Sequence, residues 1–253
     1  MPYSIMLDAG HGGADPGATY QGRQEKDDTL KLVLAIGQIL QNHGIDVEYT
    51  RTTDVYETPY EKAMEANYAE LFYFVSIHRN SFPVDNEVSG VESLVYDLSG
   101  IKYQMAQDIN EQLESVGFVN LGVHARPNLV VLRKTKMPAV LVEVGFINSD
   151  TDNMLFDQNF QDIAQAIADG IMDTLYMKEV EETDHYRVQA GAFRNRMYAE
   201  RLLNELLEQE YPAYIDDSGP YYRVQVGSFD NLNEAADMER RLKRAGYPTV
   251  IVR

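Results

Sequence analysis

The chain contains no cysteine. Disulfides and thiolate metal sites are therefore excluded, and a zinc site would need histidine and carboxylate ligands. No apolar run approaches the roughly 20 residues of a membrane span, so we expect no membrane partner. Residues 1–20 also lack the basic start and long apolar core of a secretory leader. We expect either that a leader has been removed or that the protein reaches its target without one.

Positive charge is scarce. The net charge is −18, and residues 1–177 hold 11 Lys+Arg against 26 Asp+Glu. This balance argues against a nucleic-acid partner, because the phosphate backbone demands neutralisation by lysine and arginine. It also argues against attachment to a polyanion by charge alone, so binding to an anionic matrix would need a dedicated module.

Strand and helix patterns alternate through residues 1–177, which we interpret as one domain. This order predicts an α/β fold with a mostly parallel central sheet flanked by helices. We expect strands at 5–7, 45–50, 71–78, 90–97, 128–133 and 138–148, and helices at about 25–43, 57–70, 100–117 and 157–177.

The charged run 178–184 is interpreted as a linker to a second domain, 185–253. That domain contains a repeat, because YRVQAGAF at 186–193 returns as YRVQVGSF at 222–229, an offset of 36 residues. Each copy is followed by an amphipathic helix and another strand. The pattern predicts βαβ twice, a small α+β domain with an antiparallel sheet and both helices on one face.

Strand alternation places Arg187 and Gln189 on one face of this sheet, and Arg223 and Gln225 likewise. If the helices cover Val188 and Val224, the Arg/Gln face is open and can hydrogen-bond sugar. A plain solvated sheet face remains the alternative.

Two histidines directly follow predicted buried strands. His11 lies in the glycine-rich turn of LDAGHGGADPGA, and His78 ends LFYFVSIH. The carboxyl ends of parallel strands meet at one edge, so both side chains can face one cleft. An ordinary strand-to-helix turn with an incidental histidine remains the alternative for His11.

Two carboxylates complete a candidate zinc site. Catalytic zinc commonly takes three protein ligands, and Glu25 is best placed to be the third because it opens the helix after the glycine loop. A helix-capping acid is the alternative for Glu25. Glu143 lies inside the apolar run VLVEVGF, where a charge is costly to bury. Such a carboxylate can act as a general base, although a buried ion pair is the alternative.

Four blocks in order resemble the zinc-dependent N-acetylmuramoyl-L-alanine amidases: MLDAGHGGADPGA, EKD at 25–27, SIHRNS at 76–81 and MPAVLVEVGFINS at 137–149. The resemblance covers residues 3–177. It implies zinc on His11, Glu25 and His78, with Glu143 as catalytic acid/base. The repeat resembles the SPOR domain, which binds peptidoglycan glycan strands. The combination is similar to sporulation-type, mother-cell lytic amidases.

The resemblance implies hydrolysis of the amide between N-acetylmuramic acid and L-alanine, with peptidoglycan as partner and the cell wall as the place of action. Arg79, Asn80 and His124 are candidates for substrate contact. Arg79 departs from the family, which often has a small residue there, and a long side chain at this position would line the cleft. The short segment from Asp97 to Gly100 leaves no room for the autoinhibitory helix of some members, so we expect an open cleft and a monomer.

Two other classes of function remain open. One is another zinc amide hydrolase, such as a carboxypeptidase acting on cell-wall peptides. The other is a catalytically dead wall-binding protein, against which the intact residue set argues. A phage endolysin is a biological variant of the amidase interpretation.

Overall fold

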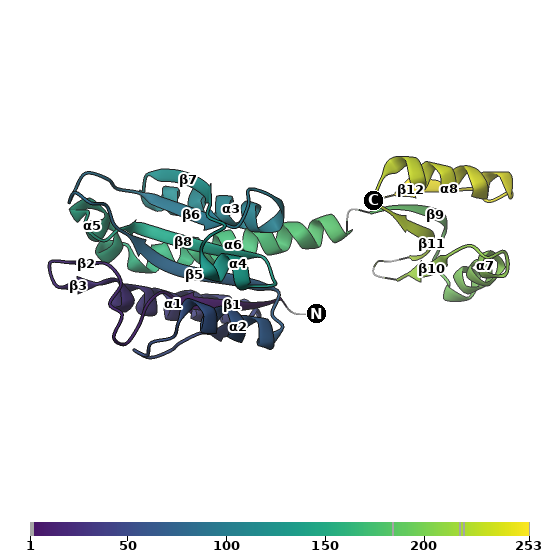
Figure 1. Ribbon diagram of the computed structural model, residues 1–253. Coiled ribbons are helices and arrows are strands. Elements are labelled where there is room, and N and C mark those ends of the chain that lie inside the picture. Colours follow the sequence, from purple (N-terminus) through teal and green to yellow (C-terminus); the bar gives the residue numbers. More distant parts are fainter. Residues whose placement is uncertain (1–2, 184, 218, 220, 253) are drawn as a thin grey trace. The chain divides into compact units, whose positions relative to one another are not determined.

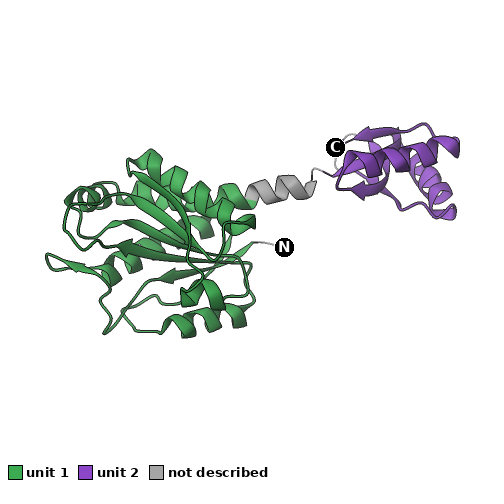
Figure 2. Cartoon of the chain, turned by 45° about the horizontal axis from the view of Figure 1, so that its top comes forward, with its two compact units in different colours: residues 1–176 green, residues 177–253 purple. Residues whose placement is uncertain are grey.

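The computed structural model (Figure 1) describes residues 3–183, 185–217, 219 and 221–252, without the side chains of residues 176–184. The chain divides into two compact units, residues 1–176 and residues 177–253 (Figure 2). Among the described residues, no helix is both long and apolar enough to cross a membrane.

Unit 1 is built on a six-stranded sheet in the order β4-β1-β5-β8-β6-β7. Its strands are β1 (Ser4–Ala9), β4 (Asp46–Tyr49), β5 (Tyr73–Asn80), β6 (Val91–Val95), β7 (Asn120–Ala125) and β8 (Ala139–Phe146). The first four in the spatial order run parallel, whereas β6 is antiparallel to β8 and parallel to β7. The mostly parallel sheet predicted from the sequence is confirmed.

Helices cover both faces of this sheet. They are α1 (Glu25–Asn42), α2 (Pro59–Ala69), α3 (Gly100–Val116), α4 (Val130–Lys134), α5 (Asp150–Gln158) and α6 (Phe160–Thr183), and a small hairpin of β2 (Thr19–Tyr20) and β3 (Arg23–Gln24) precedes α1. Apolar residues of α1, α3 and α6 pack on one face, while α2 and α4 pack on the other. Burial on both faces explains the continuous apolar runs of the central strands.

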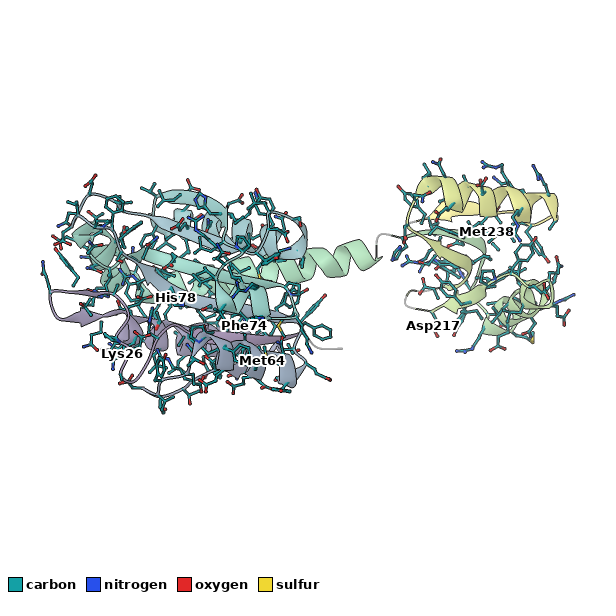
Figure 3. The ribbon with its side chains drawn as sticks, viewed as in Figure 1. Lys26, Met64, Phe74, His78, Asp217 and Met238 are labelled. Atoms are coloured by element: carbon teal, nitrogen blue, oxygen red, sulfur yellow. The ribbon has the colours of Figure 1, made fainter. Side chains whose placement is uncertain are left out.

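The two faces of the sheet carry different chemistry. Alternate residues of a strand point to opposite faces. On β5, Val75 and Ile77 join the core under α1, α3 and α6. Phe74 joins the core under α2 and α4, and His78 follows it on that same face (both labelled in Figure 3). The functional side chains therefore belong to the α2/α4 face.

One predicted strand is wrong. Residues 128–133 were expected to form a strand, but the segment carries helix α4, and the strand in this region is β7. His124 lies in this strand. A short apolar run does not distinguish strand from helix by periodicity. Here Val131 and Leu132 cover the sheet together with α2, which settles the choice in favour of helix.

The predicted linker 178–184 overlaps the end of a helix, and its role as a connection between two domains stays a prediction. Helix α6 continues through Thr183, and Asp184 lies outside the described residues. Lysine and glutamate are strong helix formers, so a charged run can extend a helix as readily as it can end one.

Unit 2 has a four-stranded antiparallel sheet in the order β10-β11-β9-β12. Its elements are β9 (Tyr186–Phe193), α7 (Arg196–Glu208), β10 (Ala213–Asp216), β11 (Tyr222–Phe229), α8 (Leu232–Arg244) and β12 (Val250–Val252). Val188 and Val224 are fully buried in a core shared with both helices. The two-fold βαβ arrangement follows the sequence repeat as predicted.

Candidate active site

The site lies at the carboxyl edge of the parallel strands. His11 follows β1, His78 lies near the end of β5, and Glu25 is the first residue of α1. Their ligand atoms all lie within 4.8 Å of one another. The three residues that the sequence analysis nominated as metal ligands are therefore brought together.

Glu25 is the centre of this group. Its Oε2 lies 3.1 Å from His11 Nε2, and its Oε1 lies 2.9 Å from His78 Nδ1. Backbone N–H groups also hold the carboxylate, because Ala18 donates to Oε2 at 2.9 Å and Arg79 donates to Oε1 at 3.0 Å. Glu25 is thus more than a capping acid: its side chain turns back into the glycine loop.

Two glycines make this approach possible. A Cβ on Gly10 would lie 2.5 Å from Cε1 of His78, and one on Gly17 would lie 2.6 Å from both Glu25 Oε2 and His11 Cδ2. His11 itself has φ of 61°, a left-handed conformation that few non-glycine residues adopt. Strain of this kind persists where the surroundings fix it, and it is frequent at functional sites.

Asp15 is a functional residue that the sequence analysis missed. Its Oδ2 lies 2.8 Å from His11 Nδ1. A carboxylate on one ring nitrogen fixes the orientation of the imidazole and leaves the other nitrogen, Nε2, to bind a metal. The spacing of four residues within one glycine loop was the available signal.

Opposite charges stabilise the group. Burial lowers the pKa of His11, but the hydrogen bonds and negative charges of Glu25 and Asp15 together outweigh burial and raise this pKa to about 9. Burial alone would raise the pKa of Glu25, yet hydrogen bonds with His11 and His78 hold it far below its usual range. Glu25 is therefore an anion facing two imidazoles.

This donor set fits zinc. It offers two imidazole nitrogens and one carboxylate, a combination that catalytic zinc sites use while leaving a further position free. Because the chain has no cysteine, no thiolate can compete for the ion. Asp15 supplies the outer carboxylate that ligating histidines commonly have.

Glu143 lies beside this group. In the sheet register Glu143 of β8 is the partner of His78 on β5, and its Oε2 is buried without a hydrogen-bond partner among the described residues. Burial raises the pKa of Glu143 to about 7, although the charge of His78 opposes this. The alternative role, a buried ion pair, finds no support, since no described Lys or Arg pairs with Glu143.

Asn80 and His124 meet at Glu92, a third carboxylate that the sequence analysis did not single out. Asn80 Nδ2 donates to Glu92 Oε1 at 2.6 Å, and His124 Nε2 lies 3.4 Å from Glu92 Oε2. Glu92 of β6 is the antiparallel partner of Glu143. Asn80 and His124 thus both contact the strand partner of Glu143, and their contact with substrate stays a prediction.

Arg79 does not line the cleft, and that prediction is wrong. Its side chain is 2% exposed, because the residue after His78 points to the opposite face of the strand. There its guanidinium pairs with Asp28 at 2.7 Å, donates to Asn153 Oδ1 at 2.8 Å and lies 4.3 Å from the ring centroid of Phe156. Only the backbone N–H of Arg79 reaches the site.

A cleft of about 270 Å³ opens beside His11 and His78. It lies on the α2/α4 face, with Pro59 and Lys62 from α2 on one side and residues 128–131 on the other. Two of its lining residues form a buried ion pair, in which Lys62 Nζ lies 2.7 Å from Asp8 Oδ1. No helix intervenes between β6 and α3, where an autoinhibitory helix was judged not to fit.

In unit 2, the predicted glycan-binding residues lie on the two central strands. Gln189 and Gln225 are direct partners across β9 and β11, so their side chains share one face. Arg223 Nη1 lies 3.4 Å from Asp216 Oδ2. Gln225 is only 5% exposed and accepts a hydrogen bond from the Tyr214 hydroxyl at 3.0 Å, so this part of the face is less open than expected. Arg187 lies on β9 as predicted.

Comparison with known families gives two matches. The N-acetylmuramoyl-L-alanine amidase family matches residues 5–173, and the SPOR domain matches residues 182–253. Both matches agree with the resemblances found in the sequence.

Individual relatives point the same way. The chain is 36% identical to a sporulation-specific N-acetylmuramoyl-L-alanine amidase of Bacillus subtilis, over 78% of each chain. It is 35% identical to an endolysin of Bacillus phage SPP1, over 71% of this chain and 68% of the other. Among solved structures, an N-acetylmuramoyl-L-alanine amidase of Clostridium difficile 630 matches with a TM-score of 0.66 and 30% identity, covering 70% of this chain and 98% of that one.

Proposed function

The chain belongs to the N-acetylmuramoyl-L-alanine amidase family, whose members act on peptidoglycan, and we propose that it hydrolyses the muramoyl–L-alanine amide with zinc as cofactor. The observation that carries the proposal is the convergence of His11, Glu25 and His78 within 4.8 Å, with Glu143 on the adjacent strand. A bound zinc ion would supply a Lewis acid that polarises the scissile carbonyl.

Glu143 is the general acid/base in this proposal. With a pKa raised to about 7, its carboxylate can accept a proton from the attacking water near neutral pH. The same group, now protonated, can deliver that proton to the nitrogen of the leaving L-alanine. Asp15 and the Ala18 N–H keep His11 and Glu25 in place throughout.

Metal removal tests the cofactor. Treating the protein with a chelator should lower muropeptide hydrolysis by about 10³-fold, since a Lewis acid contributes several kcal/mol to this chemistry. Added Zn²⁺ should restore the rate, whereas Mg²⁺, which prefers oxygen ligands, should not. The measurement pairs turnover with bound-zinc stoichiometry. Full activity in metal-free protein would contradict the zinc proposal.

The products separate this function from a carboxypeptidase. An amidase frees intact stem peptides from glycan, whereas a carboxypeptidase releases terminal amino acids. Mass spectrometry of a peptidoglycan digest distinguishes the two. A dead wall-binding protein would release neither.

We further propose that unit 2 attaches the enzyme to glycan strands, through Arg187, Gln189, Arg223 and Gln225. The match of residues 182–253 to the SPOR domain supports this role. Unit 1, with its excess of acidic residues, would gain little wall affinity from charge.

Removing unit 2 tests this division of labour. Deleting residues 185–253, which leaves α6 complete, should weaken binding to purified peptidoglycan at least about tenfold through loss of the second contact. The kcat/KM on small soluble muropeptides should stay within about twofold of the full chain, because every site residue lies in unit 1. Co-sedimentation and turnover assays check the two parts. Unchanged sedimentation would reject the proposal.

A further inference from the structure

Apart from the exposed Lys31 on α1, the unpaired positive charge that the structure describes in unit 1 lies mostly around one segment. Arg23, Lys26, Arg51, Lys62 and Arg79 all have carboxylate or carbonyl partners. By contrast, Arg133 and Lys134 lie in the last turn of α4, and Lys136 lies two residues beyond its end. Among the residues that the structure describes, the side chains of Arg133 and Lys136 make no hydrogen bond or ion pair, and both are exposed.

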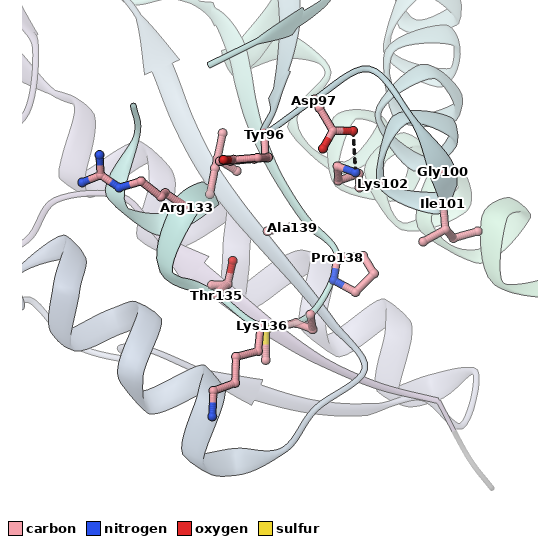
Figure 4. Close-up of a pocket in the computed structure, with 12 residues that line it drawn as sticks. Tyr96, Asp97, Gly100, Ile101, Lys102, Arg133, Thr135, Lys136, Pro138 and Ala139 are labelled. Atoms are coloured by element: carbon pink, nitrogen blue, oxygen red, sulfur yellow. Dashed lines mark ion pairs between the residues drawn. The ribbon is translucent and has the colours of Figure 1, made fainter. Parts of the chain in front are cut away.

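These cations line a hollow of about 460 Å³, seen in close-up in Figure 4. Lys102, near the start of α3, forms its opposite wall, and its Nζ lies 2.9 Å from the Asp97 carboxylate. The lining of the hollow thus includes three cations and one carboxylate, Asp97, which is already paired with Lys102. The hollow is a locally positive place in a unit with a large acidic excess.

The hollow and the active-site cleft both have residues of α4 in their walls. Val130 and Val131 of α4 line the cleft, while the next two residues, Leu132 and Arg133, line the hollow. Ala139, also in its wall, precedes Glu143 by four residues on β8, a distance of about 13 Å at 3.3 Å per residue. An extended peptide of four or five residues spans roughly 13–18 Å.

We propose that this hollow binds the carboxylates at the far end of the peptidoglycan stem peptide while its L-alanine end lies at Glu143. The inference rests on the proposed amidase function and defines its substrate as a long, anionic stem. Stem peptides carry side-chain and terminal carboxylates, which a guanidinium such as that of Arg133 binds in a two-pronged geometry. Ile101, Met137 and Pro138 supply apolar wall for the short aliphatic parts of such a peptide. Without this patch, the acidic surface would repel the substrate.

The test compares two soluble substrates, N-acetylmuramoyl dipeptide and N-acetylmuramoyl tetrapeptide. In the Arg133→Gln/Lys136→Gln variant, KM for the tetrapeptide substrate should rise about tenfold with kcat nearly unchanged, because charge-assisted hydrogen bonds to the distal carboxylates are lost. The dipeptide substrate, too short to reach the hollow, should keep its kcat/KM within about twofold. Lys31→Gln removes an exposed charge on α1, outside both hollow and cleft, and should change neither substrate.

A second arm does not depend on turnover. Calorimetric binding of the free tetrapeptide should weaken about tenfold in the double variant, and not in Lys31→Gln. Equal effects on both substrates, or unchanged tetrapeptide binding, would overturn the inference. A third outcome would also overturn it. If the double variant loses binding to a phosphate-bearing wall polymer while the ratio of kcat/KM for the tetrapeptide substrate to kcat/KM for the dipeptide substrate is unchanged, the hollow binds a different anion. If the wild-type chain binds the tetrapeptide but hydrolyses neither substrate, the amidase proposal is wrong, whereas the proposal that the hollow binds the stem peptide is kept.

Discussion

Replacing Glu143 by glutamine should lower the kcat of muropeptide hydrolysis by about 10²–10⁴-fold, the usual contribution of a positioned acid/base group. Glutamine keeps the shape of the side chain but cannot accept the proton of the attacking water. Because Glu143 lies beside the ligand group and is not one of its three members, bound zinc should stay at the wild-type level. Turnover and metal content, measured on the same preparation, check the prediction.

The stability of this variant distinguishes catalysis from a structural role. Glu143 is a carboxylate in an apolar strand, with one oxygen buried and unpartnered. A neutral amide relieves the cost of burying charge there, so the free energy of unfolding should be equal or higher. Glu111→Gln, an exposed change on α3, is the control for the substitution itself. A wild-type rate in Glu143→Gln would remove Glu143 from the mechanism, and a marked loss of stability would favour a structural part.

Replacing Arg79 by methionine should destabilise unit 1 by about 3 kcal/mol, since removing one member of a buried ion pair leaves the other uncompensated. The guanidinium contacts Asp28, Asn153 and the Phe156 ring, and methionine reproduces only part of the ring contact. Asp28 would still pair with Arg23 at 2.6 Å, and this remaining ion pair limits the loss of unfolding free energy. Urea unfolding, followed by circular dichroism, gives the free energy.

Lys31→Ala is the matched control for this measurement. Lys31 lies on the same helix as Asp28 but is exposed, and its loss should cost less than about 0.5 kcal/mol. If Arg79 contacted substrate, its variant would instead lose activity at constant stability. Unfolding free energies within 0.5 kcal/mol of wild type for Arg79→Met would therefore contradict the buried placement.

The site can be predicted from the sequence mainly because the sheet topology determines which residues come together. Residues that follow buried parallel strands must meet at one sheet edge, which is how His11 and His78 come together. Glu25 could be nominated, ahead of Asp27 and Asp28 in the same turn, because it is the first residue of the helix that follows the glycine loop. Glu143 could be singled out because burying a lone carboxylate in an apolar strand is costly, which indicates a function.

The misses share a cause, namely that local pattern does not reveal which partner covers a segment. Arg79 was expected to line the cleft because a long side chain stands where the family often has a small residue, but strand alternation turns it to the other face, where it pairs with Asp28. Helix α4 looked like a strand because four apolar residues fit either period. Gln225 was expected to be open, and Tyr214 from the neighbouring strand covers it. In each case tertiary contacts, invisible in one segment, decide the outcome.

The division of the sheet into two unlike faces has a consequence for how such a protein can change. Substitutions at Val75 or Val142 affect only the hydrophobic core beneath α1, α3 and α6. There the volume of an apolar side chain decides its effect on stability. Substitutions one position away, at Ser76 or Glu143, alter the reactive surface. Substitutions can therefore change stability and specificity almost independently along the same strand. The insertion or deletion of one residue is the exception, because it would turn the core-facing side chains toward the site and the site-facing ones toward the core.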